Sequence, residues 1–264
     1  MDVLSDDQYS VNYPMNLRRY DTVPSTSDLL KTMADEGAAE WTAVLSKSQT
    51  RGRGRLGRPW HSPPGNIYLS ILLRPTILPN ELPRLSLIAA LAVFETLRGE
   101  MLLLKLKWPN DILFEGRKLA GVLLEAKTQA EKVEYVVVGI GINLKASPAG
   151  MPEALAGKTA SLEEAGGDLN AERIIKRLEI NLRRHSTSYR GAGWEDVRAR
   201  WLECADWNRE YSAMSSGHRC VGRPVSLNPD GSLLFATSDG HVTLTSGELV
   251  DIADHRPGYQ NTMR

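Results

Sequence analysis

The sequence predicts an α+β protein that ends in a small all-β unit. Continuous apolar runs such as EYVVVGIGINL are typical of strands inside a sheet, and segments such as AERIIKRLEINLRRH carry apolar residues at helical spacing. From about residue 206, short apolar runs alternate with turn signals. We therefore expect one domain over residues 1–205 and a small β-barrel or sandwich over residues 206–264.

The N-terminal part leads into an arginine-rich loop. The first two dozen residues contain two prolines and are expected to be irregular. A helix is expected from about 26 to 36, because the hydroxyls of Ser25–Ser27 can cap its start and Gly37 suits its end. Residues 41–47 are then expected to form a strand that feeds the loop.

The middle of the chain alternates strands with one long helix. NIYLSILLRP is expected to be a buried strand that Pro75 ends. Pro83 opens a helix that is apolar nearly all round and ends at Gly99, so it should lie in the core. LLLKLKWPND should be a strand that runs into a turn, and FEGRKLAGVLLEA a turn followed by a strand. EYVVVGIGINL suits the middle of the sheet.

Two helices and a set of short strands complete the prediction. Asn170 can cap a helix over AERIIKRLEINLRRH. A second short helix is predicted by the helical spacing of Trp194, Val197 and Trp201. Turn signals in the tail, such as the NPDG sequence that begins at Asn228, separate short strands.

Composition excludes several classes of function. The chain of 264 residues is 42% hydrophobic and 24% charged, which is ordinary for a soluble globular protein. Lysine and arginine number 32, as do aspartate and glutamate, and this balance argues against a general nucleic-acid binder. Cys204 and Cys220 lack CxxC spacing, so a reducing, cytoplasmic location is expected. No apolar run approaches the ~20 residues that span a bilayer, and no secretory signal is evident.

The loop RGRGRLGRPW carries the strongest local signal. Gly52, Gly54 and Gly57 let the backbone approach a ligand closely, and successive N–H groups there can form an anion nest. Arg53 and Arg55 add forked, permanently charged donors that suit phosphate oxygens. The spacing matches neither a Walker A loop nor a Rossmann fingerprint. A phosphate site, a nucleic-acid contact and a solvated basic loop are all compatible with this stretch alone.

Two further features flank the presumed ligand site. Trp60 closes the loop and is expected to anchor one end of it in the core, because a large aromatic side chain is costly to leave in water. In KWPND, Asn110 and Asp111 lie at the end of a strand, a common place for ligand-facing groups. Asp111 could help to hold Mg²⁺, which usually binds one or two carboxylates plus substrate phosphates. A plain Asx turn is the alternative.

Polar and glycine positions in two apolar strands complete the set of candidates. Lys118 begins an otherwise apolar strand, where a fixed ammonium suits an anionic oxygen, although the side chain could also snorkel to the surface. Gly139 and Gly141 leave one strand face bare, which favours a backbone or flat ligand against it, and Asn143 follows on the same face. A β-bulge is the alternative. The five histidines lack metal-ligand spacing, and no GxSxG motif supports a nucleophile.

In this order, the motifs resemble those of the biotin protein ligases. The resemblance covers about residues 17–252 and rests on Ser25-Thr26, on Gln49 leading into GRGRLGRPW, and on KWPNDI, RKLAG and GIGIN. The tail NPDGSLLF…SGEL also resembles the SH3-like C-terminal domain of that family. The resemblance implies a catalytic domain like the core of class II aminoacyl-tRNA synthetases, with a mixed sheet and helices.

The resemblance also implies a reaction, substrates and partners. Biotin and Mg-ATP would give biotinyl-5′-AMP and pyrophosphate, and biotin would then pass to one lysine of a biotin carboxyl carrier protein or domain. ATP, Mg²⁺ and biotin are the small molecules expected, with no membrane partner. A homodimer and a monomer are both open.

Position by position, the resemblance assigns three groups of residues. The catalytic group carries fixed positive charge: Lys118, Arg53 and Arg55. The biotin-binding group surrounds the ureido head, tail and carboxylate: Ser25, Thr26, Gln49, Gly52, Arg53, Lys118, Gly121, Gly139 and Gly141. The ATP-binding group is Arg53, Arg55, Trp60, Asn110, Lys118 and Asn143, with Asp111 on the Mg²⁺ side.

The chain departs from the family in three places. Only 24 residues precede Ser25, which is too few for a three-helix DNA-binding unit, so no repressor activity or specific DNA binding is expected. KTASLEEAG has no aromatic residue for an adenine clamp, and GELVDIAD has no phosphate-reaching arginine. Two other readings stay open: a lipoate or octanoate ligase or transferase on the same fold, and a nucleic-acid-binding module that uses the arginine loop.

Overall fold

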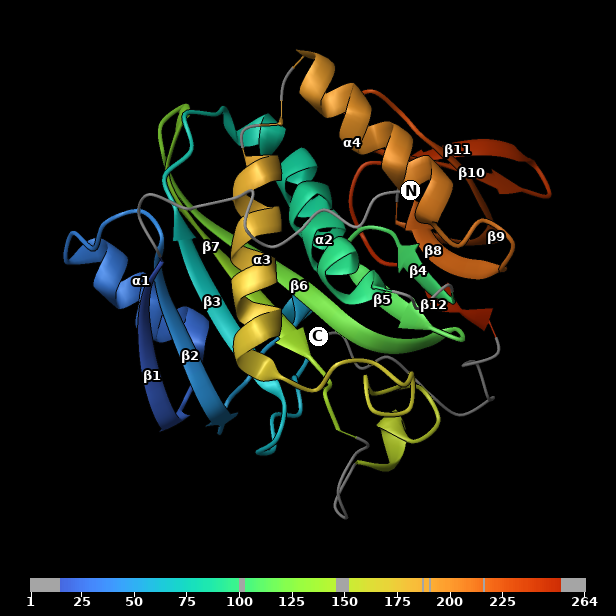
Figure 1. Ribbon diagram of the computed structural model, residues 1–264. Coiled ribbons are helices and arrows are strands. Elements are labelled where there is room, and N and C mark those ends of the chain that lie inside the picture. Colours follow the sequence, from blue (N-terminus) through green and yellow to red (C-terminus); the bar gives the residue numbers. More distant parts are fainter. Residues whose placement is uncertain are drawn as a thin grey trace.

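A seven-stranded mixed sheet with helices on both faces forms the body of the molecule, and a smaller antiparallel sheet follows it (Figure 1). The computed structural model describes residues 15–99, 103–145, 152–186, 188–189, 191–215 and 217–252. The predicted combination of a mixed sheet with helices is confirmed. The large sheet has the order β1-β2-β3-β7-β6-β5-β4, with strands β1 (Asn16–Val23), β2 (Thr42–Gln49), β3 (Ile67–Leu73), β4 (Leu104–Lys107), β5 (Asp111–Phe114), β6 (Arg117–Gln129) and β7 (Lys132–Ile142).

Four α-helices are described, and each was predicted. They are α1 (Thr26–Asp35), α2 (Leu82–Arg98), α3 (Ala171–Ser186) and α4 (Gly191–Cys204). The caps follow the sequence, because Ser25 Oγ accepts from the Asp28 backbone N–H at 3.3 Å and Asn170 Oδ1 accepts from that of Arg173 at 3.1 Å. Three short 3₁₀ turns accompany them: η2 (Arg55–Gly57), η3 (Pro79–Glu81) and η4 (Glu153–Leu155). Among the described residues, no helix has the length and apolar character needed to cross a membrane.

The prediction of an irregular N-terminal segment is wrong from residue 16 onward. Asn16–Val23 forms β1, which pairs in parallel with β2 at the edge of the sheet. Only Val23 of this strand is buried, so NLRRYDTV lacks the apolar pattern that marks a central strand. Residues 1–14, which the same prediction covered, lie outside the described residues.

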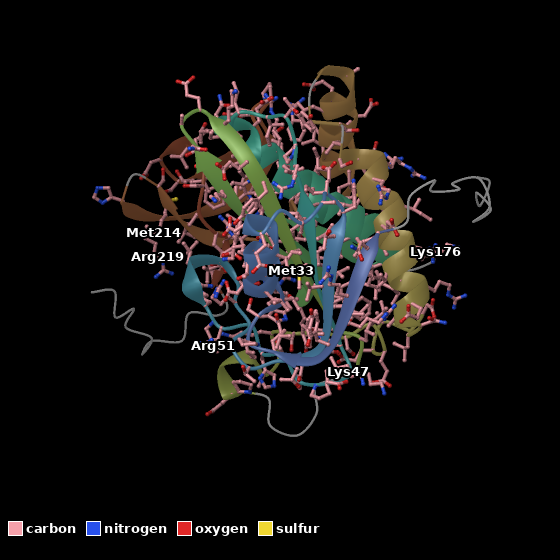
Figure 2. All side chains as sticks on the ribbon, turned by 90° about the vertical axis from the view of Figure 1, so that its left-hand side faces the viewer. Met33, Lys47, Arg51, Lys176, Met214 and Arg219 are labelled. Carbon is pink, nitrogen blue, oxygen red and sulfur yellow. The ribbon has the colours of Figure 1, made fainter. Side chains whose placement is uncertain are left out.

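The two faces of the large sheet have different roles. Helices α2 and α3 cover one face, where Val136 and Val138 of β7 belong to the main core with Ile88 of α2. Helix α1 covers part of the other face, where Val137 packs in a smaller cluster with Leu30. Figure 2 shows α1, labelled at Met33, and α3, labelled at Lys176, on opposite sides of the sheet. Since strand side chains alternate, the β7 glycines 139 and 141 face the α1 side.

The C-terminal β unit packs against α4 and contacts turns of the large domain. Its strands are β8 (Tyr211–Ser215), β9 (His218–Leu227), β10 (Leu233–Thr237), β11 (Gly240–Leu244) and β12 (Val250–Asp251), in the order β11-β10-β9-β8-β12. The predicted turn at Asn228 is present, because the Gly231 N–H donates to its carbonyl at 2.9 Å. Trp108 Nε1 of the large domain donates to the Gly231 carbonyl at 3.2 Å. The boundary between residues 205 and 206 and the SH3-like topology stay predictions.

Candidate active site

One pocket on the α1 side of the sheet collects the predicted motifs. Its cavity volume is about 280 Å³, near the lower end of the range of ligand pockets, which is roughly 300–1,000 Å³. Every predicted site residue except Gly52 lines it: Ser25, Thr26, Gln49, Arg53, Arg55, Trp60, Asn110, Asp111, Lys118, Gly121, Gly139, Gly141 and Asn143. Motifs spread from Ser25 to Asn143 therefore converge on one site.

A row of paired residues crosses the floor of this pocket. Strand pairing places Tyr68, Gly141, Gly121 and Asp111 side by side on β3, β7, β6 and β5. The two glycines in the middle of the row leave a flat depression between a phenol and a carboxylate. The indole of Trp60 lies in it, because a Cβ on Gly141 would be 2.5 Å from Trp60 Cε2.

The expectations for Trp60 and the strand glycines need correction. Trp60 lines the pocket and is not part of the core, so it fastens the loop to the glycine face of the sheet. The predicted bare face is also covered next to Gly139, where a Cβ would lie 2.7 Å from Ser27 Oγ. Sequence reasoning located the flat surface correctly, but a side chain of the same protein occupies it. The Trp60 Nε1–H is buried without an acceptor among the described residues.

A chain of hydroxyl and amide groups closes one end of the pocket. Gln49 Oε1 accepts from the Thr26 backbone N–H at 2.9 Å and from Thr26 Oγ1 at 3.1 Å, while Gln49 Nε2 donates to Ser62 Oγ at 3.0 Å. Ser70 Oγ donates to Thr26 Oγ1 at 2.8 Å and lies 3.0 Å from Ser27 Oγ. This end therefore offers both donors and acceptors to a polar ligand group. Ser70, a fully buried serine in an apolar strand, was missed by sequence reasoning.

Gly52 is required by packing below the loop. A Cβ there would lie 2.5 Å from Ser62 Oγ and 2.6 Å from the Trp60 carbonyl. Its own carbonyl accepts from the Trp60 N–H at 2.9 Å. The residue therefore sets the path of the loop, and its predicted contact with biotin stays a prediction.

A β-bulge turns Lys118 into the pocket. On β5, Ile112 pairs with Ala120 while the next residue, Leu113, pairs with Lys118, so Leu119 is an extra residue in β6. Without it, alternation would place Lys118 on the α2 face. Lys118 Nζ instead lies 2.6 Å from Asp111 Oδ1.

The carboxylate of Asp111 is buried between two lysines. Lys118 Nζ contacts one oxygen, and Lys107 Nζ lies 3.4 Å from the other. Burial alone would raise the pKa of Asp111, but the two ammonium groups outweigh it and hold that pKa below its ordinary value. Across the described residues, no three His, Cys, Asp or Glu side chains are grouped to hold a metal ion. Asp111 therefore holds Lys118 in place, and its predicted position on the Mg²⁺ side stays a prediction.

The loop arginines have contrasting partners. Arg53 donates to both oxygens of Asp28, each at 2.5 Å. Arg55 Nη1 is buried with no acceptor within the described part of the chain, and burial lowers the pKa of this guanidinium. Arg58 Nη1 lies 2.8 Å from Oε1 of Glu248 in the C-terminal unit. Among these three arginines, Arg55 would therefore gain most from an anionic ligand, because the burial of its charge is not compensated by a partner in the described part of the chain.

The two predicted asparagines brace the backbone around Lys118. Asn110 Nδ2 donates to the Val122 carbonyl. Asn143 Nδ2 donates to the carbonyls of Lys118 at 3.3 Å and Ala160 at 3.1 Å. Both side chains line the pocket while these amide groups hold neighbouring strands. Their predicted contacts with ATP stay predictions.

Several pocket residues had no role in the sequence prediction. The segment around Lys158 pairs with Lys118, because the Lys118 N–H donates to the Lys158 carbonyl at 2.8 Å. Lys158, Thr159 and, from the C-terminal unit, Glu248 all line the pocket. No local pattern marks a pairing between segments forty residues apart. Lys107 could have been found, since it opens the KWPND motif.

Comparison with known proteins relates the chain to one family. The Biotin/lipoate A/B protein ligase family matches residues 20–143. A biotin--[acetyl-CoA-carboxylase] ligase of Paracoccus denitrificans is 35% identical, over 86% of this chain and 97% of the relative. A bifunctional ligase/repressor BirA of Bacillus subtilis (strain 168) is 30% identical, over 87% of this chain and 72% of the relative.

Solved structures give the same result. The biotin protein ligase from Aquifex aeolicus in complex with biotin and ATP has a TM-score of 0.71 to this chain at 30% identity. The match covers 89% of this chain and 97% of that one. Because these likenesses in sequence and structure extend over most of both chains, this chain belongs to the biotin protein ligases of the Biotin/lipoate A/B protein ligase family.

Proposed function

We propose that this chain is an AMP-forming ligase that activates biotin with Mg-ATP and transfers it to a lysine of a biotin carboxyl carrier protein or domain. Its relatives are named for this activity, and a structural neighbour is a complex with biotin and ATP. The observation that carries the proposal is the position of Lys118, which a bulge directs into a pocket that Arg55 also lines, with a buried Nη1 that has no acceptor among the described residues. The pocket thus combines fixed cations with a neutral polar end.

The first step joins two anionic groups. An oxygen of the biotin carboxylate attacks the α-phosphorus of ATP, forming a P–O bond while the bond to the bridging oxygen of pyrophosphate breaks. Like-charge repulsion opposes this approach, so preorganised cations are the main requirement. Lys118 would bridge the carboxylate and the α-phosphate, and Arg55 would face the phosphates. Mg²⁺, which arrives with ATP, would neutralise further phosphate charge.

Biotin orientation follows from the shape and polarity of the pocket. The ureido ring of biotin has both N–H donors and a carbonyl acceptor, which suit the end formed by Ser25, Thr26 and Gln49. A lipoyl dithiolane ring or an octanoyl chain has neither N–H donors nor a ring carbonyl, so it could not exchange hydrogen bonds with this end of the pocket. The tail would lie against the Trp60 indole, which covers Gly121 and Gly141. These features favour biotin over the lipoate alternative.

The nucleotide would take the side of the pocket formed by KWPND and the segment next to Lys118. Arg55, Asn110, Asn143 and Trp60 complete the proposed ATP group, and Asp111 holds Lys118 there. In the second step, a neutral carrier lysine attacks the acyl carbon. An amide C–N bond forms, the acyl–phosphate C–O bond breaks, the amine loses a proton and AMP leaves.

The finer organisation belongs to the same proposal. The C-terminal unit over 206–264 would be the SH3-like domain and residues 1–205 the catalytic domain. The enzyme would work in the cytoplasm, where its carrier protein is made. Dimer formation is left to measurement.

Mass spectrometry of a carrier domain tests this proposal. Incubation with the protein, Mg-ATP and biotin should add one biotinyl group, whereas lipoate or octanoate in place of biotin should add nothing. Acylation by lipoate or octanoate but not by biotin would support the alternative substrate class. An unmodified carrier with all three acids would contradict the proposal.

A further inference from the structure

We propose that Arg53 is a positioning residue, which Asp28 and Glu125 hold in place, and that these contacts fix where Arg55 of the same loop lies. The loop is residues 51–60, whose first residue, Arg51, is labelled in Figure 2. The catalytic part of this inference rests on the proposed function. It replaces the equal roles that the sequence assigned to the two arginines.

A cluster of four charges joins the loop to two elements of the sheet body. Each guanidinium nitrogen Nη1 and Nη2 of Arg53 contacts one oxygen of Asp28 on α1, and Nη2 lies 3.4 Å from Glu125 Oε1 on β6. Lys31 Nζ completes the cluster at 2.9 Å from Glu125 Oε1 and 3.1 Å from Asp28 Oδ1. The two-point contact uses the planar fork of arginine, which a lysine cannot reproduce. The Arg53 guanidinium also holds the pKa of Asp28 down at about 2.

Electrostatics disfavours a phosphate next to Arg53. Arg53 and Lys31 are balanced by Asp28 and Glu125, so the cluster has no excess positive charge to offer. A phosphate that reached Arg53 would also approach both carboxylates. If Arg53 turned away instead, Lys31 would be the only cation of the cluster left to pair with the carboxylates of Asp28 and Glu125. Glu125 would then be poorly compensated, because its Oε2 is already buried without a donor among the described residues. Breaking such a cluster is unfavourable because it leaves charges unpaired.

Arg55 has the opposite environment. Its Nη1 is buried and has no acceptor in the described part of the chain, and the charges that act on it come from the more distant Glu248 and Asp111. Desolvating a cation without a partner is costly, and an incoming carboxylate or phosphate would remove that cost. Arg55 therefore has a donor, Nη1, that is available to an anion, and binding an anion would offset the cost of burying its charge.

The loop geometry couples the two arginines. Arg53 pairs with Pro59 in an antiparallel bridge, and the Gly54 N–H donates to the Arg58 carbonyl at 2.8 Å. The loop is thus a tight hairpin, and only Gly54 separates the fastened arginine from Arg55. Fixing Arg53 to α1 and β6 sets where the Arg55 guanidinium lies.

Asp28→Asn gives opposite results for the two roles of Arg53. If Arg53 is a fastener, the variant should raise the KM for biotin and the release of free adenylate about five- to tenfold, with kcat for pyrophosphate exchange within about twofold. If Arg53 binds phosphate and Asp28 merely restrains it, the variant should lower the KM for ATP or increase the rate, which would overturn the proposal. Asp28→Glu, which keeps the charge in the first turn of α1, should restore retention of the adenylate.

A matched control uses the same helix and the same strand. Asp35 of α1 pairs with Lys127 of β6 at 3.0 Å, outside the residues that line the pocket. Asp35→Asn should leave adenylate retention and both KM values unchanged. Equal effects of Asp35→Asn and Asp28→Asn would mean that general loosening of α1 explains the result, and would overturn the role given to Arg53.

A double-mutant cycle separates the two arginines. Arg53→Met should match Asp28→Asn, and the double variant should be no worse than either single one, because both remove the same contact. Arg55→Met should instead lower kcat/KM for exchange by about 10²–10³-fold, as expected for a lost charge-stabilising donor. A loss for Arg53→Met as large as that for Arg55→Met, additive with Asp28→Asn, would overturn the assignment.

Limited trypsin digestion of the full chain tests the fastening without any activity. Asp28→Asn should speed cleavage after Arg51 and Arg55 severalfold relative to wild type and Asp35→Asn, because a loosened loop opens more often. Unchanged cleavage would overturn the fastening. If wild type shows no biotin-dependent exchange while Asp28→Asn still frees the loop, the proposed function fails and the fastening stands.

Discussion

The side chain that the proposed function places at the reacting groups is Lys118, and Asp111 fixes where Lys118 lies. A buried carboxylate 2.6 Å from the Lys118 ammonium group orients it, while Lys107 holds the other oxygen at 3.4 Å. The ion pair also stabilises the fold, because removing the carboxylate would leave the ammonium groups of Lys118 and Lys107 close together without a counter-charge. Stability and catalysis therefore share these atoms.

The Asp111 carboxylate should contribute to acid sensitivity. Its folded pKa lies below the ordinary value of 3.8, so its contribution to stability is fully present above that pH and is lost as the pH falls below it. Asp111→Asn should lower the free energy of unfolding at pH 7 by about 1–3 kcal/mol and flatten its fall below pH ~4. Urea unfolding at several pH values measures both effects. A variant with wild-type stability at pH 7 would count against the pairing.

Sequence reasoning at the residue scale identified the lining of the pocket but not its internal contacts. KWPND, RKLAG and GIGIN all reach one cavity. The fastening of Arg53 by Asp28 could not be read from the sequence, because a partner 25 residues away carries no local signal. The same holds for Ser70, whose buried hydroxyl meets Thr26 and Ser27 only through the tertiary structure. Sequence motifs indicate which residues line the same pocket, whereas the contacts between those residues depend on the tertiary structure.

At the scale of elements, two devices shape the floor of the pocket. The extra residue Leu119 in β6 turns Lys118 toward the ligand side, and paired glycines on β6 and β7 accept the Trp60 indole. An apolar strand with a lysine at its start predicts neither the bulge nor the direction of that lysine. The helices were predictable because their caps and apolar faces are local, whereas β1 was missed because an edge strand needs little apolar surface.

Gly141→Ala tests how Trp60 lies on the sheet. The added Cβ would stand 2.5 Å from the indole, so the ring must leave the depression. We expect a change in tryptophan fluorescence toward that of a solvated indole and a loss of biotin affinity of tenfold or more, about 1.4 kcal/mol. Titration of the intrinsic fluorescence with biotin measures both. Unaltered emission and affinity would show that the indole does not lie over Gly141.

At the scale of the molecule, the C-terminal unit is part of the active-site assembly. Trp108, next to the KWPND turn, donates to Gly231, and Glu248 meets the arginine loop through Arg58. Arg209 also links the carboxylate of Asp251, at 2.8 Å, to the turn between β5 and β6. The sequence predicted a separate β unit but not this docking, because contacts between distant segments have no periodic signature.

Trp108→Phe should weaken the docking of the C-terminal unit. It removes the Nε1–H donor and leaves the Gly231 carbonyl unpaired in a buried site, at a cost of about 1–3 kcal/mol in the free energy of unfolding. Trp207→Phe is the control, because its Nε1–H donates to Leu202, only five residues away. Chemical denaturation should show the larger loss for Trp108→Phe. An equal or smaller loss than for Trp207→Phe would contradict the docking role.

Biotin-dependent ATP–pyrophosphate exchange measures the formation of the adenylate alone, which is the step that the cations of this pocket would promote. Wild-type protein should catalyse exchange with biotin and not with lipoate or octanoate. Lys118→Ala should reduce the rate by about 10²–10³-fold or more, as for loss of a preorganised cation. Lys127→Ala, which removes an exposed lysine from the same strand, should keep the wild-type rate. Undiminished exchange by Lys118→Ala, or no exchange with biotin by wild-type protein, would contradict this account.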